Sequence, residues 1–214
     1  MSSLFSLQGE TALVTGGTRG IGQACAIALA EAGADLILIQ RNTAATETKQ
    51  AVEALGRKAT VYTADLSSQD DVAKLVPKIL ADGHTIRILI NCAGIQIRHP
   101  VEVFPDSDFN QGGLNVPAYA ASKGAVGQLT KSMANGWSDK GVTVNCIAPG
   151  YIETEMNSAL LADPKRLASI SERIPAGRWG TPDDFKGSVI YLASKAGAYV
   201  SGHTLVVDGG WMGR

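Results

Sequence analysis

A glycine-rich stretch near the N-terminus constrains this chain more than any other feature. It reads Thr11-Ala12-Leu13-Val14-Thr15-Gly16-Gly17-Thr18-Arg19-Gly20-Ile21-Gly22. The apolar run is short enough for a buried strand, and residues 23–32 are rich in the Ala and Leu that favour a helix. Glycines at the turn allow a sharp bend and let a phosphate approach the backbone amides at the helix N-terminus. The stretch predicts a strand–turn–helix that holds a pyrophosphate, although glycines that only make the turn would give the same pattern.

Length, charge and cysteine content narrow the class of protein. The 214 residues can bury one α/β core, so we expect a single domain over 1–214. The formal charge of −1 gives no electrostatic case for nucleic acid or an acidic membrane, so the expected partner is a small molecule. The three cysteines, Cys25, Cys92 and Cys146, lack CxxC spacing, and the three histidines are scattered. We therefore expect a reduced, cytoplasmic chain without a metal site, signal peptide or membrane span.

Strands and helices alternate along the first 94 residues. Apolar runs predict strands over 34–39, 59–66 and 86–90, and helical patterns lie between them at 43–55 and 70–81. This alternation predicts an α/β fold, a Rossmann-type doubly wound parallel sheet flanked by helices on both faces. A ligand of such a sheet lies at the C-terminal strand ends, where the sequence places Gly16, Arg41, Asp65 and Asn91.

The end of the second strand bears on the choice of cofactor. An acidic side chain there suits the ribose 2′-hydroxyl of NAD, and a basic one suits the 2′-phosphate of NADP. Arg41 occupies this position and Arg19 is a possible second cation, which favours NADP slightly over NAD unless both are plain surface charges. Asp65, after the third strand, could accept a hydrogen bond from an adenine amino group or cap the helix that begins near Ser67 or Ser68.

Two residues in the next helix form a candidate proton-transfer pair. Residues 117–126 begin a helix in which Tyr119 and Lys123, at positions i and i+4, lie on one face. A neighbouring ammonium lowers the pKa of a phenol, which otherwise lies near 10. The pair could therefore act as a general acid and base, although an isolated Tyr-x-x-x-Lys is more often an ordinary helix face.

The C-terminal half continues the pattern. A strand is predicted over 142–148 and is closed by Pro149–Gly150, which brings Thr154 within reach of a nicotinamide amide. We expect helices at 157–161 and 163–174 to form a flap over the substrate. A helix at 182–194 has Pro in its first turn, and the last strand covers 204–208.

These motifs together resemble the short-chain dehydrogenase/reductase family over the whole chain. Residues 15–22 resemble its TGxxxGxG loop, residues 91–94 its NNAG motif with Cys92 in place of the second Asn, and Tyr119 with Lys123 its YxxxK pair. Residues 173–180 and 207–211 are most similar to the 2-deoxy-D-gluconate 3-dehydrogenase (2-keto-3-deoxygluconate oxidoreductase) branch, whose members oxidise or reduce keto-sugar acids.

The resemblance implies a tetrameric or dimeric oxidoreductase that transfers a hydride between NADP or NAD and a small hydroxyl or carbonyl substrate. Tyr119 would be the general acid/base, and Lys123 would lower its pKa and hold the nicotinamide ribose. The cofactor-binding residues that it implies are Gly16, Thr18, Arg19, Gly20, Ile21, Gly22, Arg41, Asn42, Asp65, Leu66, Asn91, Ala93, Gly94, Tyr119, Lys123, Pro149, Gly150, Ile152 and Thr154.

One departure from the family is large. Between Gly94 and Tyr119 the family fits a long helix, a central strand and its catalytic serine, whereas this chain has no strand-length apolar run there. We expect a missing βα unit with the join near Asn110 and Gln111, and hypothesise that the segment belongs to the protein but not to this sequence. Ser107 is not assigned the serine's role. Rival interpretations are a dinucleotide-binding protein without catalysis and, with less support, an epimerase-like enzyme.

Overall fold

The computed structural model describes residues 3–94 and 117–213, with the backbone alone for 117–120. The chain divides into two compact units, the first comprising the described residues of 1–93, 150–197 and 208–214, and the second those of 94–149 and 198–207. Each unit is described by itself. The expectation of a single domain over 1–214 stays a prediction.

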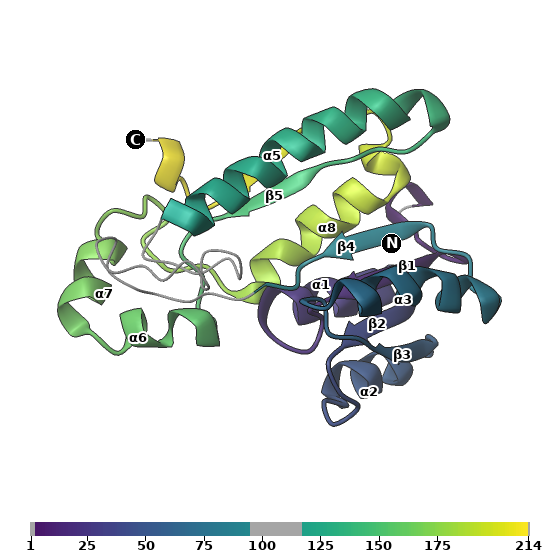
Figure 1. Cartoon of the computed structure of the whole chain (residues 1–214). Helices are drawn as coiled ribbons and strands as arrows, with labels where there is room; N and C mark the ends of the chain where they lie inside the picture. The colour runs from purple at the N-terminus through teal and green to yellow at the C-terminus, as the bar shows by residue number, and fades with distance from the viewer. Residues whose placement is uncertain (1–2, 95–116, 214) are drawn as a thin grey trace. The chain divides into compact units, whose positions relative to one another are not determined.

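The first unit begins with the predicted alternation of strands and helices (Figure 1). Its helices after residue 150 are short. The elements are β1 (Thr11–Thr15), α1 (Gly20–Glu31), β2 (Asp35–Gln40), α2 (Glu47–Ala54), β3 (Ala59–Thr63), α3 (Gln69–Ala81), β4 (Ile88–Asn91), α6 (Ser158–Leu161), α7 (Pro164–Ser171) and α8 (Lys186–Ala193).

The four strands of this unit form a parallel sheet in the order β3-β2-β1-β4. Leu13 of β1 pairs with Ile37 of β2 on one side and with Leu89 of β4 on the other. The chain therefore builds the sheet from β1 towards β3 and then returns to the opposite side of β1. This reversal creates a topological switch point between the C-terminal ends of β1 and β4, where ligands of open α/β sheets bind.

Helices cover both faces of this sheet. On one face, Leu75 and Ile79 of α3 pack with residues of β1, β2 and β3 in a cluster completed by Leu13, Ile37, Ile39, Tyr62 and Ala64. Alternate residues of the same strands point to the other face and are also buried, and α1 contacts both β1 and β2. The expected doubly wound α/β arrangement is confirmed.

The second unit contains one long helix and a two-stranded parallel sheet. Helix α5 (Pro117–Trp137) runs beside β5 (Cys146–Pro149), which pairs with β6 (Thr204–Val207) (Figure 1). Short 3₁₀ helices complete the two units: η1 (Ser3–Phe5), η3 (Ser138–Lys140), η4 (Glu155–Asn157), η5 (Pro182–Phe185), η6 (Lys195–Gly197) and η7 (Trp211–Gly213).

Several element boundaries differ from the sequence prediction. The helix expected from Thr43 begins only at Glu47, because Asn42 Oδ1 accepts from the Ala44 amide and Gln40 donates to the Ala45 carbonyl, which holds a turn. The strand expected from Val142 begins only at Cys146, because the Asn145 side chain bonds the Val200 carbonyl and the His203 amide. Local side-chain bonds of this kind compete with helix and strand.

The helices expected at 163–174 and 182–194 are also shortened. The first is α7, whose N-terminus is capped by the Asp163 carboxylate. The second starts as η5, with a capping box between Thr181 and Asp184, and becomes α-helical from Lys186. Within the described part of the chain, no helix is both long and apolar enough to cross a membrane.

Candidate active site

Three glycines shape the turn between β1 and α1, and two of them leave no room for a side chain. A Cβ on Gly22 would lie 2.2 Å from the Gly16 carbonyl oxygen, and one on Gly16 would lie 2.7 Å from Ala93 Cα. Gly16 and Gly20 also have positive φ, 68° and 56°, a backbone conformation that favours glycine. The predicted use of these glycines for a tight turn and close helix–strand packing is confirmed.

The turn sits at the switch point beside the residues that follow β4. The Thr15 hydroxyl, almost fully buried, accepts from the amides of Cys92 and Ala93 at 3.2 Å and donates to the Ile90 carbonyl. One side chain therefore fixes the backbone of residues 92–93 against Gly16. Asn91, Ala93 and Gly94 are exposed there, as expected of residues that line a ligand crevice.

The N-terminus of α1 opens onto the same place. Arg19 occupies the N-cap position in an extended conformation, and its side chain makes no capping hydrogen bond. The first amides of an α-helix have no partner within the helix and carry the positive end of its dipole. These amides suit a phosphate, so the site fits the pyrophosphate of a dinucleotide.

Two positioning residues behind the turn were missed by the sequence analysis. The hydroxyl of Thr48, in α2, donates to the Gly17 carbonyl at 2.8 Å and accepts from Gln23 Nε2 at 2.9 Å. Gln23 also donates to the Thr18 carbonyl. Thr48 is buried, and no local signal identifies it because its partners lie 25 and 31 residues earlier in the chain.

The ends of β2 and β3 carry the residues expected at the adenosine side. Arg41 and Asn42 are exposed directly after β2, and Asp65 and Leu66 are exposed after β3. Asp65 Oδ1 accepts from the amide and the hydroxyl of Ser67 at 2.9 and 2.7 Å. These two bonds, with a smaller effect of Arg41, lower the pKa of the Asp65 carboxyl.

The alternative role of Asp65 as a helix cap is wrong. Ser68 is the N-cap of α3, and its hydroxyl accepts from the Asp71 amide. Asp65 instead closes a turn before the helix, so a carboxylate stands at the edge of the sheet. Its proposed contact with adenine stays a prediction.

The loop after Gly150 approaches the start of α1. A Cβ on Gly150 would lie 2.6 Å from Asp208 Cα, and Ile152 is buried in an isolated bridge with Gly180. A Cβ on Gly20 would lie 3.6 Å from Thr154 Cγ2. The structure therefore brings Thr154 to the glycine turn, while Pro149 belongs to the second unit as the last residue of β5.

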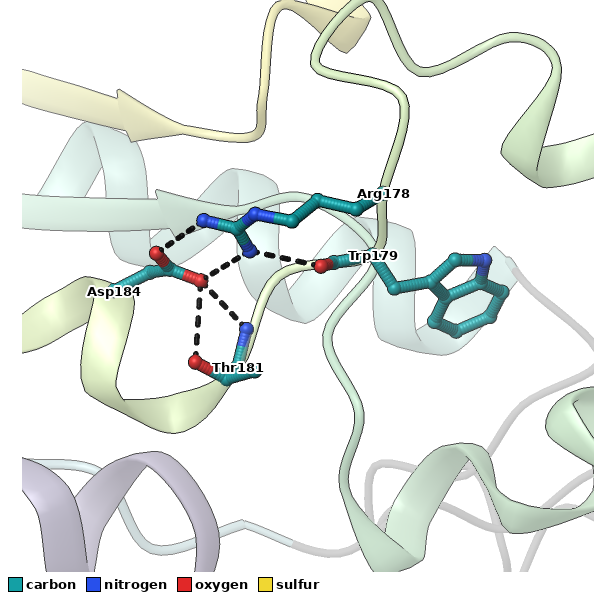
Figure 2. A network of polar contacts seen from close by, with 4 residues as sticks. All are labelled: Arg178, Trp179, Thr181 and Asp184. Carbon is teal, nitrogen blue, oxygen red and sulfur yellow. Dashed lines mark hydrogen bonds and ion pairs between the residues drawn. The ribbon is translucent and has the colours of Figure 1, made fainter.

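A polar network among residues 178–184 supports this loop (Figure 2). Arg178 donates to both Asp184 oxygens, at 2.8 and 2.7 Å, and to the Trp179 carbonyl, while the Thr181 amide and hydroxyl donate to Asp184 Oδ2. These bonds hold the pKa of Asp184 well below its usual range, with Arg178 as the largest cause. The network fixes the turn that carries Gly180, and Gly180 pairs with the loop.

An ion pair joins the glycine turn to the start of η4. Arg19 Nη1 contacts Glu155 Oε2, and both side chains are mostly exposed. Arg41 forms no salt bridge within 3–94 or 117–213, so of the two predicted cations only Arg19 already has a carboxylate partner.

The predicted proton-transfer pair lies in the second unit. Tyr119 and Lys123 are one turn apart in the first two turns of α5, and Lys123 is exposed. The same helical stripe continues to Thr130 and Ala134, which are buried. Their helical spacing is confirmed, whereas their proton chemistry stays a prediction. Ser107 and the join near Asn110 and Gln111 lie outside the described residues.

Two further observations concern a buried thiol and possible metal ligands among the described residues. Burial, with a smaller effect of Cys92, raises the pKa of the Cys25 thiol to about 12, so this thiol stays protonated at neutral pH. No group of three or more His, Cys, Asp or Glu residues that could hold a metal occurs in the described part of the chain.

Family models match the chain in two overlapping parts. The model described as short chain dehydrogenase matches residues 10–116, and the model described as enoyl-(acyl carrier protein) reductase matches residues 106–212. The curated relatives include 2-dehydro-3-deoxy-D-gluconate 5-dehydrogenases of Pseudoalteromonas atlantica, 43% identical with full coverage of both chains, and of Bacillus subtilis, 42% identical over 98% of this chain and 97% of the relative. The first alignment spans 254 positions, 40 more than this chain has residues.

The solved structures that are similar to this chain include dehydrogenases of the same kind. A gluconate 5-dehydrogenase from Burkholderia cenocepacia in complex with NADP and tartrate superposes with a TM-score of 0.93, at 34% identity over 99% of this chain and 98% of that one. A Beutenbergia cavernae protein described as an NAD(P)-dependent gluconate 5-dehydrogenase, with bound NADP, has a TM-score of 0.93 at 37% identity over 99% and 100%.

Proposed function

Since the chain belongs to the short-chain dehydrogenase/reductase family, a family of oxidoreductases, we propose that it interconverts a hydroxyl and a keto group of a sugar acid with NADP. The curated relatives support a gluconate or 2-dehydro-3-deoxygluconate as the substrate class. The observation that carries the proposal is the turn at the switch point, where Gly16 and Gly22 pack too closely against neighbouring backbone for any Cβ and the first amides of α1 have no partner within the helix.

The cofactor would lie along the C-terminal edge of the first unit. Gly16, Gly22 and the α1 amides would hold the pyrophosphate, with Thr18 and Ile21 in the same turn. Asn42, Asp65 and Leu66 would line the adenosine side, and the residues after β4 and after Gly150, including Ile152 and Thr154, the nicotinamide side. The nicotinamide supplies or accepts the hydride when it is bound.

The preference for NADP rests on two arginines. Arg41 would meet the 2′-phosphate directly, because it is exposed at the end of β2 and outside the salt bridges of the described residues. Arg19 would join it only by exchanging its Glu155 partner for the phosphate. Arg41 is therefore the main determinant of the preference.

Proton transfer would be carried by α5. Tyr119 would give a proton to, or take one from, the substrate oxygen, and Lys123 one turn later would stabilise the phenolate. The serine that the family resemblance implies at the substrate carbonyl has no assigned residue in this chain, so the rate would rest on this pair and on alignment of the reactants.

Assembly and location complete the proposal. We expect a homotetramer or homodimer, as the family resemblance implies, and a location in the cytoplasm, as the cysteine content predicts. The cysteines are free thiols, with Cys25 buried and Cys92 and Cys146 partly buried, which suits a reducing compartment.

The test is a titration of NADPH and NADH followed by turnover with sugar acids. We expect Arg41→Ala to weaken NADPH binding about tenfold or more and to leave NADH unchanged, because a charge-assisted hydrogen bond is worth about 1.5–3 kcal/mol. Lys58→Ala, an exposed cation at the opposite edge of the sheet, is the matched control. Equal losses of NADPH and NADH affinity in Arg41→Ala would contradict the role of Arg41 in the NADP preference. Tight NADPH binding without turnover of any sugar acid or sugar would contradict the proposed oxidoreductase activity.

A further inference from the structure

Three aromatic residues of the first unit form a cluster in the segments around its last loops. Tyr151 comes two residues after the end of β5 and Trp211 four residues after the end of β6, and their ring centroids are 4.8 Å apart. Trp179 completes the cluster, with its ring centroid 5.2 Å from that of Tyr151. Strands β5 and β6 are parallel, so both segments begin at C-terminal strand ends, where ligands of open α/β sheets bind.

A cation lies on this cluster. The guanidinium carbon of Arg173 is 4.2 Å from the centroid of the Trp211 ring, which is a cation–π contact. Arg173 forms no salt bridge within residues 3–94 and 117–213. A guanidinium over an aromatic ring still presents N–H donors at its edge, and that edge matches the two oxygens of a carboxylate. Arg173 is therefore held in place by an aromatic ring while its charge has no carboxylate partner in this part of the chain.

Backbone contacts hold Arg173 and Trp211 together. The Ala176 amide donates to the Gly209 carbonyl at 2.9 Å, which joins the segment after α7 to the turn before Trp211. The Asp208 carboxylate closes this turn by accepting from the amides two and four residues later, each at 2.8 Å. A cation that is positioned before binding loses little conformational freedom when it takes up a ligand.

We propose that Arg173, positioned by Trp211, binds the carboxylate of the sugar acid. This inference rests on the proposed function, and it names the group of the substrate that this part of the chain recognises. Tyr151, in contact with Trp211, directly precedes Ile152, which is assigned above to the nicotinamide side. One loop thus connects the residues near the hydride with the cluster that holds the cation.

The neighbouring Arg178 is not suited to this role. Its guanidinium donates to both oxygens of Asp184 and to the Trp179 carbonyl, so its donors are already used within the chain. A substrate carboxylate at Arg178 would have to displace Asp184. At Arg173 a substrate carboxylate displaces no salt bridge of the described residues, and the charge-assisted bonds it gains are not offset by a lost ion pair.

The first test is steady-state kinetics of Arg173→Gln with NADP and gluconate or 2-dehydro-3-deoxygluconate. We expect the KM for the sugar acid to rise about tenfold or more, because charge-assisted hydrogen bonds are lost, and the affinity for NADP to stay unchanged. Arg166→Gln, at an exposed arginine of α7, is the matched control and should behave as wild type. Arg173→Lys keeps the charge without the planar fork and should recover part of the loss.

A purely structural role for Arg173 gives a different result. It would lower kcat or the affinity for NADP in Arg173→Gln and leave the KM for the sugar acid unchanged, and Arg173→Lys would not rescue it. Either of these results, or an unchanged KM in a folded Arg173→Gln, would overturn the inference. Circular dichroism establishes that the variants are folded.

A calorimetric titration of gluconate into the protein with NADP measures binding without turnover. Gluconate should bind Arg173→Gln at least tenfold more weakly than wild type, whereas glucitol, with CH₂OH in place of the carboxylate, should bind both with the same low affinity. Binding that depends on Arg173 without any turnover would support this inference and contradict the proposed reaction. Turnover with equal gluconate affinity in wild type and Arg173→Gln, or no gluconate binding by wild type, would contradict this inference.

Discussion

Strands β2 and β4 have nearly the same apolar character, with the sequences DLILIQ and ILIN, yet they differ in burial. Every residue of β2 after Asp35 is buried, whereas in β4 only Ile88 is buried and Leu89 is more than half exposed. Strand β2 has neighbours on both edges and helices on both faces, and β4 has one neighbouring strand in the described residues. Burial of an apolar strand is therefore a property of its place in the sheet, because side chains of equal hydrophobicity stay exposed where no described neighbouring strand or helix covers them.

The largest effect should come from Ile37 and Leu89, which pair with the same residue, Leu13. Ile37→Ala leaves a cavity in the core and should cost about 2–5 kcal/mol of unfolding free energy. Leu89→Ala, at a side chain that is already more than half exposed, should change it by less than about 0.5 kcal/mol. Urea unfolding measures both. Similar costs would mean that β4 is covered within one chain.

The next effect concerns the glycine turn, the most tightly packed part of the site. Gly22→Ala forces a Cβ against the Gly16 carbonyl and should cost about 1–3 kcal/mol and abolish NADPH binding, because the turn must shift. Gly187→Ala in α8 is the control, since its Cβ would meet nothing within 4 Å and alanine favours a helix. Thermal unfolding and NADPH fluorescence report the two effects. Undiminished binding in Gly22→Ala would remove this turn from the cofactor site.

The smallest effect is the pH dependence of the Arg178–Asp184 network. Because the folded pKa of Asp184 lies below the value of about 3.9 in the unfolded chain, the unfolded state takes up the proton first as the pH falls. The stabilisation is complete above about pH 5 and is lost progressively as the pH falls below about 4 towards the folded pKa. Both side chains are partly exposed, so the loss should lower the Tm by at most about 2–4 °C.

The matched variant is Asp184→Asn, which keeps the shape of the side chain and loses its charge. Its Tm should fall less steeply than that of the wild type between pH 5 and pH 3, and Asp183→Asn, at an exposed neighbouring position, should follow the wild type. Parallel curves for wild type and Asp184→Asn would show that the network contributes nothing.

Much of the first unit could be predicted from the sequence because its signals are local. The β1 strand, the glycines at 16, 20 and 22 and the alternation up to β4 follow from hydrophobic period and from backbone conformations that favour glycine. The predicted element boundaries were wrong where a side chain forms a hydrogen bond with nearby backbone, as Asn42 does before α2 and Asn145 does before β5. The cap of α3 was predicted as one possible role of Asp65, and the structure instead has Ser68 at the N-cap position.

The sequence by itself determined the glycine turn and the helical spacing of Tyr119 and Lys123, because turn chemistry and helical spacing act over a few residues. Only the tertiary structure decided that Thr48 braces the Gly17 carbonyl, that Glu155 holds Arg19, and that Leu89 stays exposed while Ile37 is buried. Each of these depends on which distant segments meet. These tertiary contacts result from the packing of the whole fold, and a stretch of a few residues does not encode that packing.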